Sequence, residues 1–191
     1  MSGAQCLWGL RLGEHNGRVS RDSQEALLLR TLGWLDRVLV EHHLDYWVFG
    51  GWAVDLYAGR VTRPHSDIDV AIWYEDLKQI NALLTRADWV HRPEPGQDGY
   101  TGYERGSARL ELAFLARDHT GVIYTPLAVG RGHWPPESFG SDRAQLGDVN
   151  ARVVGLASLI EDKSGPRQDP AVAAKDRADV ENLRLLHHNQ L

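Results

Sequence analysis

The segment over residues 50–69, GGWAVDLYAGRVTRPHSDID, decides the fold. Just before it, residues 46–49 form a short aromatic and β-branched run, which is typical of a buried strand that closes on two glycines. Residues 52–58 show helical spacing, and Gly59 is a suitable residue to end a helix. Residues 67–73, DIDVAIW, alternate in character as a strand does. The order predicted is therefore strand, glycine turn, helix and strand.

Two carboxylates share one face of the second predicted strand. Asp67 and Asp69 project from one side, while Ile68 and Val70 project into the core from the other. Carboxylates about 7 Å apart along one face repel each other when both are ionised and have no partner. A divalent cation removes that conflict, and Mg²⁺ favours one or two protein carboxylates together with water and phosphate oxygens. The pair therefore indicates a magnesium site for a nucleoside triphosphate.

Gly50 and Gly51 separate the first strand from the helix. Backbone N–H groups at a helix N-terminus can hold a phosphate, and glycine lets the phosphate approach closely. Taken alone, a D-x-D sequence is common by chance, and a Gly-Gly turn is more often only a turn. Their joint occurrence, with the elements in this order, is the stronger signal.

These residues resemble the signature of the DNA polymerase β-like nucleotidyltransferase superfamily, a glycine pair followed by D-h-D. The segment looks closest to the small aminoglycoside 2″-adenylyltransferases and lincosamide nucleotidyltransferases. Outside this segment the chain is only compatible with them in length and element order. The matching positions are Gly50, Gly51, Trp52, Asp55, Arg60, Arg63, His65, Asp67 and Asp69.

The resemblance implies an α/β fold, a mixed sheet flanked by helices, with Mg²⁺ held by Asp67 and Asp69. It implies transfer of a nucleoside monophosphate from a triphosphate, with ATP as the expected donor, to a hydroxyl of a small molecule such as an aminoglycoside or lincosamide antibiotic. Pyrophosphate is released. The family also uses a third carboxylate from a neighbouring strand, for which Glu111 is the candidate. Relatives carry Asp there, so metal ligand and general base both stay open for Glu111; the structural alternative is an ion pair with Arg109 or Arg105.

Candidates for binding the triphosphate lie on both sides of the Asp pair. Arg63 fits a phosphate contact and a salt bridge to Asp55 equally well. Lys163, at the end of a predicted helix, resembles a triphosphate-binding lysine of nucleotidyltransferases, and a solvated helix-end lysine is the alternative. Residues 175–179, KDRAD, are predicted to form a salt-bridged helix face. The expected nucleotide-binding residues are Gly50, Gly51, Arg60, His65 and Lys163.

An acceptor pocket is expected where aromatic and acidic residues fall in loop or edge regions. Such groups suit a polyamine sugar, because cations bind both carboxylates and aromatic faces. The candidates are Tyr100, Tyr103, Glu104 and Trp134.

The remaining pattern is predominantly helical at both ends of the chain. We predict three domains or segments: an extension over 1–22, a nucleotidyltransferase core over 23–150 and a C-terminal helical element over 151–191. Helices are predicted over 23–44, capped by Asp22 or Ser23, and over 75–86, 157–163 and 170–188, the last with Asp169 as N-cap and Pro170 following it. Strands are predicted over 89–91, 100–105 and 109–116, with a turn at Gly106 and Ser107, and 126–149 is mostly loop with room for short strands.

Composition limits the classes of protein that fit. The 191 residues carry 21 Lys and Arg against 26 Asp and Glu, a formal charge of −5. This balance disfavours a nucleic-acid surface and suits a cationic partner. The single cysteine excludes an internal disulfide, and no apolar run is long enough for a membrane span, so we expect a cytoplasmic protein. The resemblance to the small nucleotidyltransferases implies a monomer or a homodimer.

Two other functions stay open at this point. A nucleotidyltransferase of toxin–antitoxin type would modify tRNA or protein, although the acidic balance counts against tRNA. A non-catalytic nucleotide-binding module would keep the fold without turnover. The presence of both Asp residues and a plausible third carboxylate favours an enzyme over such a module.

Overall fold

The computed structural model describes residues 21–93 and 98–188. The predicted extension over 1–22 lies almost wholly outside them, as does much of the turn-rich stretch before Tyr100. The helices are α1 (Arg21–Glu41), α2 (Gly50–Ala58), the 3₁₀ turn η1 (Tyr74–Asp76), α3 (Leu77–Arg86), α4 (Leu156–Ser164) and α5 (Pro170–His188). The strands are β1 (Tyr46–Val48), β2 (Ile68–Trp73), β3 (Val90–Arg92), β4 (Tyr100–Arg105), β5 (Ala108–Arg117), β6 (Ile123–Pro126), β7 (Arg131–His133), β8 (Arg143–Leu146) and β9 (Val149–Arg152).

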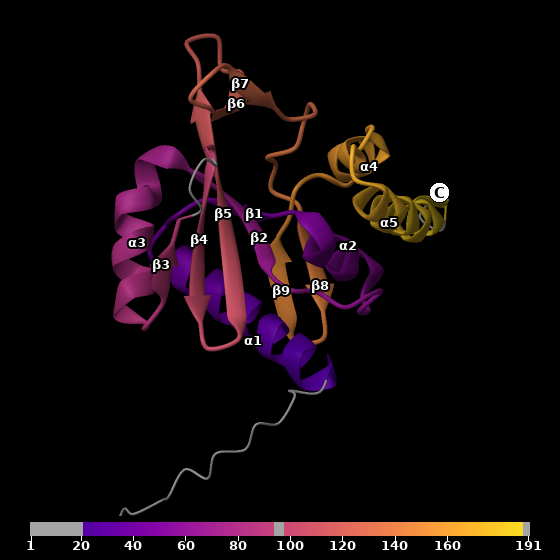
Figure 1. Cartoon of the computed structure of the whole chain (residues 1–191), viewed down its shortest axis with the longest axis horizontal. Coiled ribbons are helices and arrows are strands. Elements are labelled where there is room, and N and C mark those ends of the chain that lie inside the picture. Colours follow the sequence, from indigo (N-terminus) through magenta and orange to yellow (C-terminus); the bar gives the residue numbers. More distant parts are fainter. Residues whose placement is uncertain (1–20, 94–97, 189–191) are drawn as a thin grey trace, which may run out of the picture.

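The main sheet is mixed, as predicted. Its strand order is β1-β2-β5-β4-β3, with β6 pairing to the end of β5 and β7 pairing to β6. Strands β2 and β5 are parallel, and the other neighbours are antiparallel. Figure 1 shows β6 and β7 projecting beyond the end of β5. The register places Asp69 of β2 beside Glu111 of β5, and Glu111 beside Gly102 of β4.

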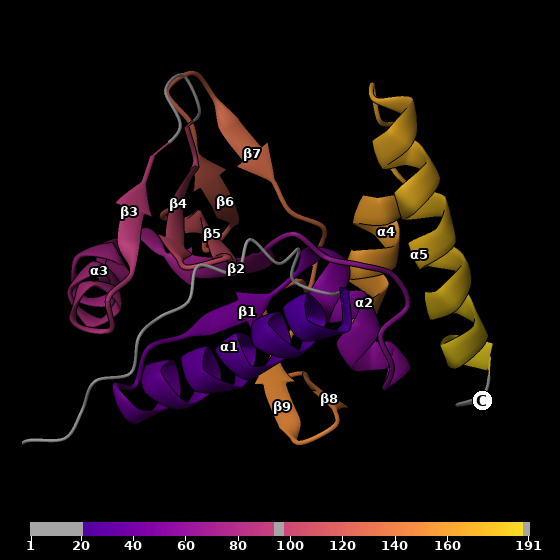
Figure 2. The same cartoon turned by 60° about the horizontal axis from the view of Figure 1, so that its bottom comes forward.

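One face of the sheet carries the hydrophobic core. Ile68 and Val70 of β2 and Leu110 and Leu112 of β5 are fully buried, as the alternation predicts. They belong to one cluster with residues of α1 and α3, and Figure 2 shows these two helices along the same side of the sheet. Asp69 and Glu111 therefore project from the opposite face. The leucine and isoleucine side chains that α1 and α3 add are Leu28, Leu32, Leu35, Leu39, Ile80 and Leu84.

Helices α4 and α5 lie beside α2 (Figures 1 and 2). The β8–β9 hairpin crosses the domain boundary predicted at residue 150, and Val153 bridges to Val48 of β1. The helical element therefore starts with α4. The predicted cap of α5 is confirmed, since the Ala171 N–H donates to Asp169 Oδ1 at 2.7 Å.

Several predicted boundaries are wrong for local reasons. Gly50 and Gly51 form the first residues of α2, because the φ of +66° at Gly50 turns the chain from β1 directly into the helix. Asp22 and Ser23 lie inside α1 and do not cap it; the side chain of Gln24 anchors this end through a 2.9 Å bond to Ser107 O. The third helix opens with the η1 turn before α3 begins.

Part of the loop predicted over 126–149 is folded into the short strands β7 and β8. Within residues 21–93 and 98–188, no helix has the length and apolar character that crossing a bilayer requires.

Candidate active site

Asp69 lies against the first residue of α2. A Cβ added to Gly50 would stand 2.1 Å from Asp69 Oδ2, so the carboxylate occupies the space that any side chain at position 50 needs. The Phe49 N–H donates to Asp69 O at 3.1 Å and holds the end of the first strand beside β2. The strand, the glycine and the carboxylate therefore form one packed unit.

The carboxylates of this face are crowded together. Asp69 and Glu111 are direct neighbours on parallel strands, which lie about 4.8 Å apart. The pKa of Asp69 is raised to about 7: burial is the largest cause, the negative charges of Asp67 and Glu111 add to the rise, and the positive charges of Lys163 and Arg63 act against it. The site therefore disfavours an ionised Asp69 in the absence of a cation.

This donor set fits Mg²⁺. Asp67 directly precedes β2 and lies close enough for its negative charge to raise the pKa of Asp69, and this repulsion between the two carboxylates is what a bound cation would relieve. Among the described residues, no three His, Cys, Asp or Glu side chains are already gathered as a complete metal site. Glu111 Oε1 accepts a bond from Arg109 Nη2 at 2.9 Å, so the ion pair of the structural alternative is present. Two carboxylates suffice for Mg²⁺ when phosphate oxygens and water complete its shell.

His65 packs against the start of α2. A Cβ at Gly51 would come within 2.5 Å of His65 ring atoms, and the His65 ring lies 4.6 Å from that of Trp52. His65 Nε2 donates to Asp55 Oδ2 at 2.6 Å, because an ionised carboxylate only accepts. The family-signature residues Asp55 and His65 therefore form a buried pair under the second glycine of α2.

The predicted salt bridge from Arg63 to Asp55 is wrong, because the guanidinium turns to α5. Arg63 Nε and Nη2 donate to Asp179 at 3.1 and 3.2 Å, a two-bond fork of the kind that guanidinium and carboxylate favour. Arg63 Nη1 lies 3.3 Å from His65 Nδ1. Arg63 thus joins the His65 pair to the C-terminal helix.

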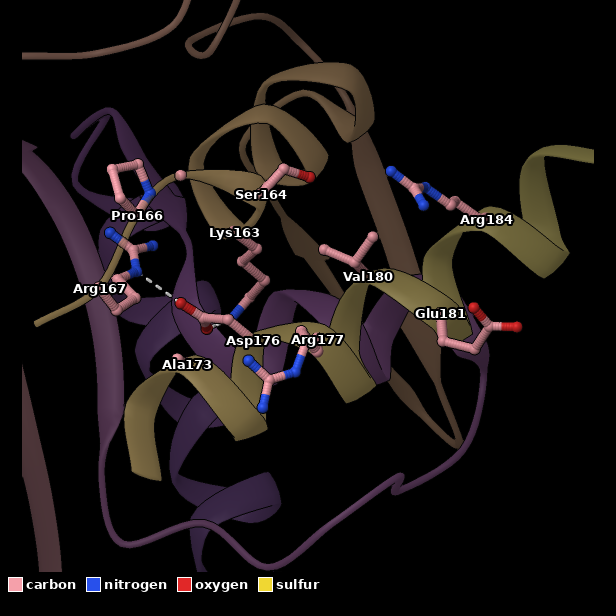
Figure 3. A pocket seen from close by; sticks show the side chains of 11 residues that line it. Lys163, Ser164, Pro166, Arg167, Ala173, Asp176, Arg177, Val180, Glu181 and Arg184 are labelled. Carbon is pink, nitrogen blue, oxygen red and sulfur yellow. Dashed lines mark hydrogen bonds and ion pairs between the residues drawn. The ribbon is translucent and has the colours of Figure 1, made fainter. Parts of the chain in front are cut away.

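Lys163 also faces α5. Its Nζ lies 3.0 Å from Asp176 Oδ1 and 2.7 Å from Asp179 Oδ2, and the residue is 7% exposed, so the solvated alternative is wrong. Figure 3 shows Lys163 and Arg167 converging on Asp176. Arg60, at the surface, donates to Asn182 Oδ1 at 2.9 Å. The acidic residues of the 175–179 run therefore pair with cations of other elements instead of forming the salt bridges within the helix that the sequence pattern predicts.

A cavity of about 520 Å³ opens beside Asp69 and Glu111. Four carboxylates and three aromatic side chains contribute to its lining, and among the described residues no lysine or arginine does. Trp134 is fixed there by a 2.9 Å bond from its Nε1 to Thr125 Oγ1 and by an edge contact with Phe49. The carboxylate residues of the lining are Asp69, Asp98, Glu111 and Asp162, the Phe, Tyr and Trp residues are Phe49, Tyr100 and Trp134, and His133 adds an imidazole.

The structure brings two of the four predicted acceptor residues to this cavity, Tyr100 and Trp134. Tyr103 points the other way: it pairs with Leu110 on the core face, is 1% exposed and donates to Asn81 of α3. Glu104 lies on β4, forms an ion pair with Arg92 of β3 at 3.3 Å and does not line the cavity. The expectation for these two is therefore wrong, because strand alternation separates Tyr103 from Glu111.

Sequence reasoning missed three of the lining residues. Asp98 precedes β4, Asp162 neighbours Lys163 on α4, and Phe49 closes the first strand. Phe49 had a signal, because it stands beside the glycine pair. Asp98 and Asp162 are brought together only by the tertiary fold, and no spacing in the sequence marks them.

Residues 34–159 match the family model of the aminoglycoside-2″-adenylyltransferases. The chain belongs to this family. A 2″-aminoglycoside nucleotidyltransferase of Escherichia coli is 43% identical over 44 residues, which are 23% of this chain and 25% of that protein, and one of Klebsiella pneumoniae matches equally. The aligned segment thus spans about a quarter of the length of these curated relatives.

Solved structures of antibiotic adenylyltransferases share the fold. A lincosamide antibiotic adenylyltransferase with bound lincomycin superposes with a TM-score of 0.65 at 17% identity, covering 82% of this chain and 96% of that one. ANT(2″)-Ia in complex with adenylyl-2″-tobramycin gives 0.57 at 18% identity, covering 89% and 97%. The fold of this family member is therefore the nucleotidyltransferase fold.

Proposed function

We propose that the protein transfers a nucleoside monophosphate, with ATP as the expected donor, to a hydroxyl of a cationic amino sugar of the aminoglycoside class. The observation that carries this proposal is the cavity beside Asp69 and Glu111, whose lining adds Asp98 and Asp162 and, within the described residues, no lysine or arginine. An aminoglycoside bears several positive charges at neutral pH, and carboxylates and aromatic faces attract such charges. The family and the tobramycin-derived ligand of the structural neighbour agree with this acceptor class.

Asp67 and Asp69 would hold Mg²⁺ in this reaction. When bound, the ion would offset the negative charge of the triphosphate and orient it. Mg²⁺ binding would also favour the ionised form of Asp69. Burial and the neighbouring carboxylates act the other way, because they raise the pKa of this residue. The two glycines at the start of α2 leave room for the side chains of Asp69, His65 and Arg63, as the contacts of an added Cβ at either position indicate.

Glu111 is our candidate for the general base. It lines the acceptor cavity and stands directly beside Asp69, so a hydroxyl bound in the cavity would lie within its reach. The Glu111 carboxylate accepts the hydroxyl proton while the acceptor oxygen forms a bond to the α-phosphorus. The bond from the α-phosphorus to the bridging oxygen breaks, and pyrophosphate leaves with that oxygen.

The remaining nucleotide-binding assignments also stay proposals. The positive charges of Lys163 and Arg63 act on Asp69, which supports a place beside the triphosphate for both. His65 contributes through its buried pair with Asp55 and its contact with Gly51. Arg60 lies at the surface next to α5. The proposal includes a cytoplasmic location, where nucleoside triphosphates are available.

The test is an incubation of purified protein with Mg²⁺, each labelled nucleoside triphosphate in turn, and a panel of aminoglycosides and lincosamides. We expect labelled aminoglycoside and stoichiometric pyrophosphate, with lincosamides poorer because they carry fewer positive charges. If folded protein labels none of these acceptors, the proposal is rejected. Label appearing instead on tRNA or protein in a lysate would point to the toxin–antitoxin type of reaction.

A further inference from the structure

Asp179 of α5 contacts two cations, the half-buried Arg63 and the buried Lys163. It accepts the two-bond fork of Arg63 at 3.1 and 3.2 Å and the ammonium of Lys163 at 2.7 Å. The residue is 1% exposed, so it has no surface to offer a substrate. Any contribution that Asp179 makes to the reaction must pass through the two cations.

These two cations come from different segments of the chain, and Asp179 is a partner of both. Arg63 lies between α2 and β2, and Lys163 lies near the end of α4. Of the two aspartates on α5, Asp179 holds both cations, whereas Asp176 holds Lys163 and Arg167. Removal of Asp179 would therefore separate Arg63 from Lys163, while removal of Asp176 would leave their shared partner in place.

The guanidinium of Arg63 lies at the start of α2. Its Nη2 would lie 2.6 Å from a Cβ at Gly51, so the guanidinium covers the second glycine of the helix. A helix N-terminus and a guanidinium at the same place both favour phosphate. Asp176 and Asp179 together use two of the three N–H donors of Lys163, so the ammonium retains a donor beyond these two bonds.

We propose that Asp179 is a positioning residue for the nucleotide: it holds Arg63 and Lys163 side by side so that both cations bind the triphosphate. This inference rests on the proposed function and deepens it, because it makes α5 a part of the nucleotide site. The sequence pattern alone predicts only a salt-bridged helix face there. The opposite role, in which Asp179 withholds the cations from phosphate, predicts tighter nucleotide binding when the carboxylate is lost.

The test compares Asp179→Asn with the matched control Asp176→Asn. Both substitutions remove one buried negative charge from the same helix, but Asp176 does not touch Arg63. We measure the Kd of Mg·ATP by calorimetry, with Mg complexes of GTP, CTP and UTP in parallel, then KM for nucleotide and for acceptor, and Tm. We expect Asp179→Asn to raise the nucleotide Kd and KM at least tenfold with little change in acceptor KM, and Asp176→Asn to raise them less than threefold.

A purely structural role is excluded by a KM change confined to the nucleotide. Equal effects of the two variants, or an unchanged or lower Kd for Asp179→Asn, would overturn the inference. If Asp179→Asn does not fold, Asp179→Glu replaces it in the test, because this variant keeps the charge but displaces both cations by the length of one methylene. We then expect the nucleotide Kd to rise at least threefold at an unchanged Tm. An unaltered Kd would overturn the inference.

The outcome for Asp179 is separable from that for the proposed function. If the wild-type protein binds a Mg·nucleotide but labels no acceptor, the proposed function fails and the Kd comparison still decides the role of Asp179. If the wild-type protein transfers nucleotide and the variants bind it equally well, only the inference fails. A wild-type protein that binds none of the four nucleotides overturns both.

Discussion

Replacement of Gly50 by alanine tests the link between the glycine turn and Asp69. Gly50 has a φ of +66°, and an added Cβ would stand 2.1 Å from Asp69 Oδ2. Alanine therefore introduces two separable effects: backbone strain in α2 and displacement of the carboxylate. Gly59 supplies the control, because its φ is +64° while its added Cβ meets only Gln145 O at 4.0 Å.

The size of each effect follows from the geometry. A left-handed conformation costs a residue with a Cβ about 1–2 kcal/mol, so both variants should lose roughly that much free energy of unfolding. Only Gly50→Ala must also push the Asp69 carboxylate back by about 1 Å to restore an ordinary contact distance. A misplacement of that size at a catalytic group costs on the order of 100-fold in rate.

The assay combines pyrophosphate release with denaturant unfolding. We expect Gly50→Ala to lose on the order of 100-fold in kcat/KM, and Gly59→Ala to keep the rate within about twofold at a similar loss of stability. Retention of wild-type activity by Gly50→Ala would refute the claim that this glycine makes room for a working Asp69. An equal rate loss in both variants would assign the effect to strain in α2 instead.

Three further predictions concern the carboxylates and the cavity. Asp67→Asn and Asp69→Asn should each reduce transfer below detection in the labelled-nucleotide assay with an unchanged circular dichroism spectrum, because the change is isosteric and removes the metal-binding charge; activity in either variant would contradict the assignment. In metal-free protein, Asp69 holds its proton up to its pKa of about 7, against 3.8 ordinarily, so its contribution to the free energy of unfolding should fall as pH rises through this window. Urea titrations at several pH values should show this decline in the wild type and a flatter profile in Asp69→Asn, and identical profiles would disprove it. Trp134→Ala should raise the acceptor KM about tenfold by removing an aromatic wall, with nucleotide KM unchanged, whereas Tyr74→Ala, an exposed aromatic outside this cavity, should alter neither.

The parts of the fold that sequence could predict are those with local causes. The alternation of Ile68 and Val70 with Asp69 placed the strand and its two faces, and Asp169 before Pro170 located the start of α5, because period and capping act within a few residues. The order β1-β2-β5-β4-β3 and the parallel pairing of β2 with β5 have no such local sign. Sequence therefore indicated the proposed metal-binding pair and not the strand geometry around it.

The site residues that sequence misplaced depend on long-range packing. Tyr103 and Tyr100 lie in one strand and look alike in sequence, yet the antiparallel register with β5 turns Tyr103 to the core and leaves Tyr100 at the cavity. Asp179 and Asp176 looked like an ordinary charged helix face, since nothing local shows that Arg63 lies 116 positions earlier and meets one of them. The partners of Asp176 and Asp179 therefore depend on where α5 packs.

Under the proposed function, the charges around Asp69 would sort the two substrates. Arg63 and Lys163 contact α5, and the Arg63 guanidinium lies at the N-terminus of α2, so a triphosphate would find cations there. Asp98 and Asp162 line the cavity together with Glu111, where an amino sugar would find carboxylates. A triphosphate placed in that cavity would meet like charge, and an amino sugar placed between the two cations would do so as well. The net charge of −5 conceals this separation, and we infer that the separation, more than the total, fixes which substrate occupies which side of Asp69.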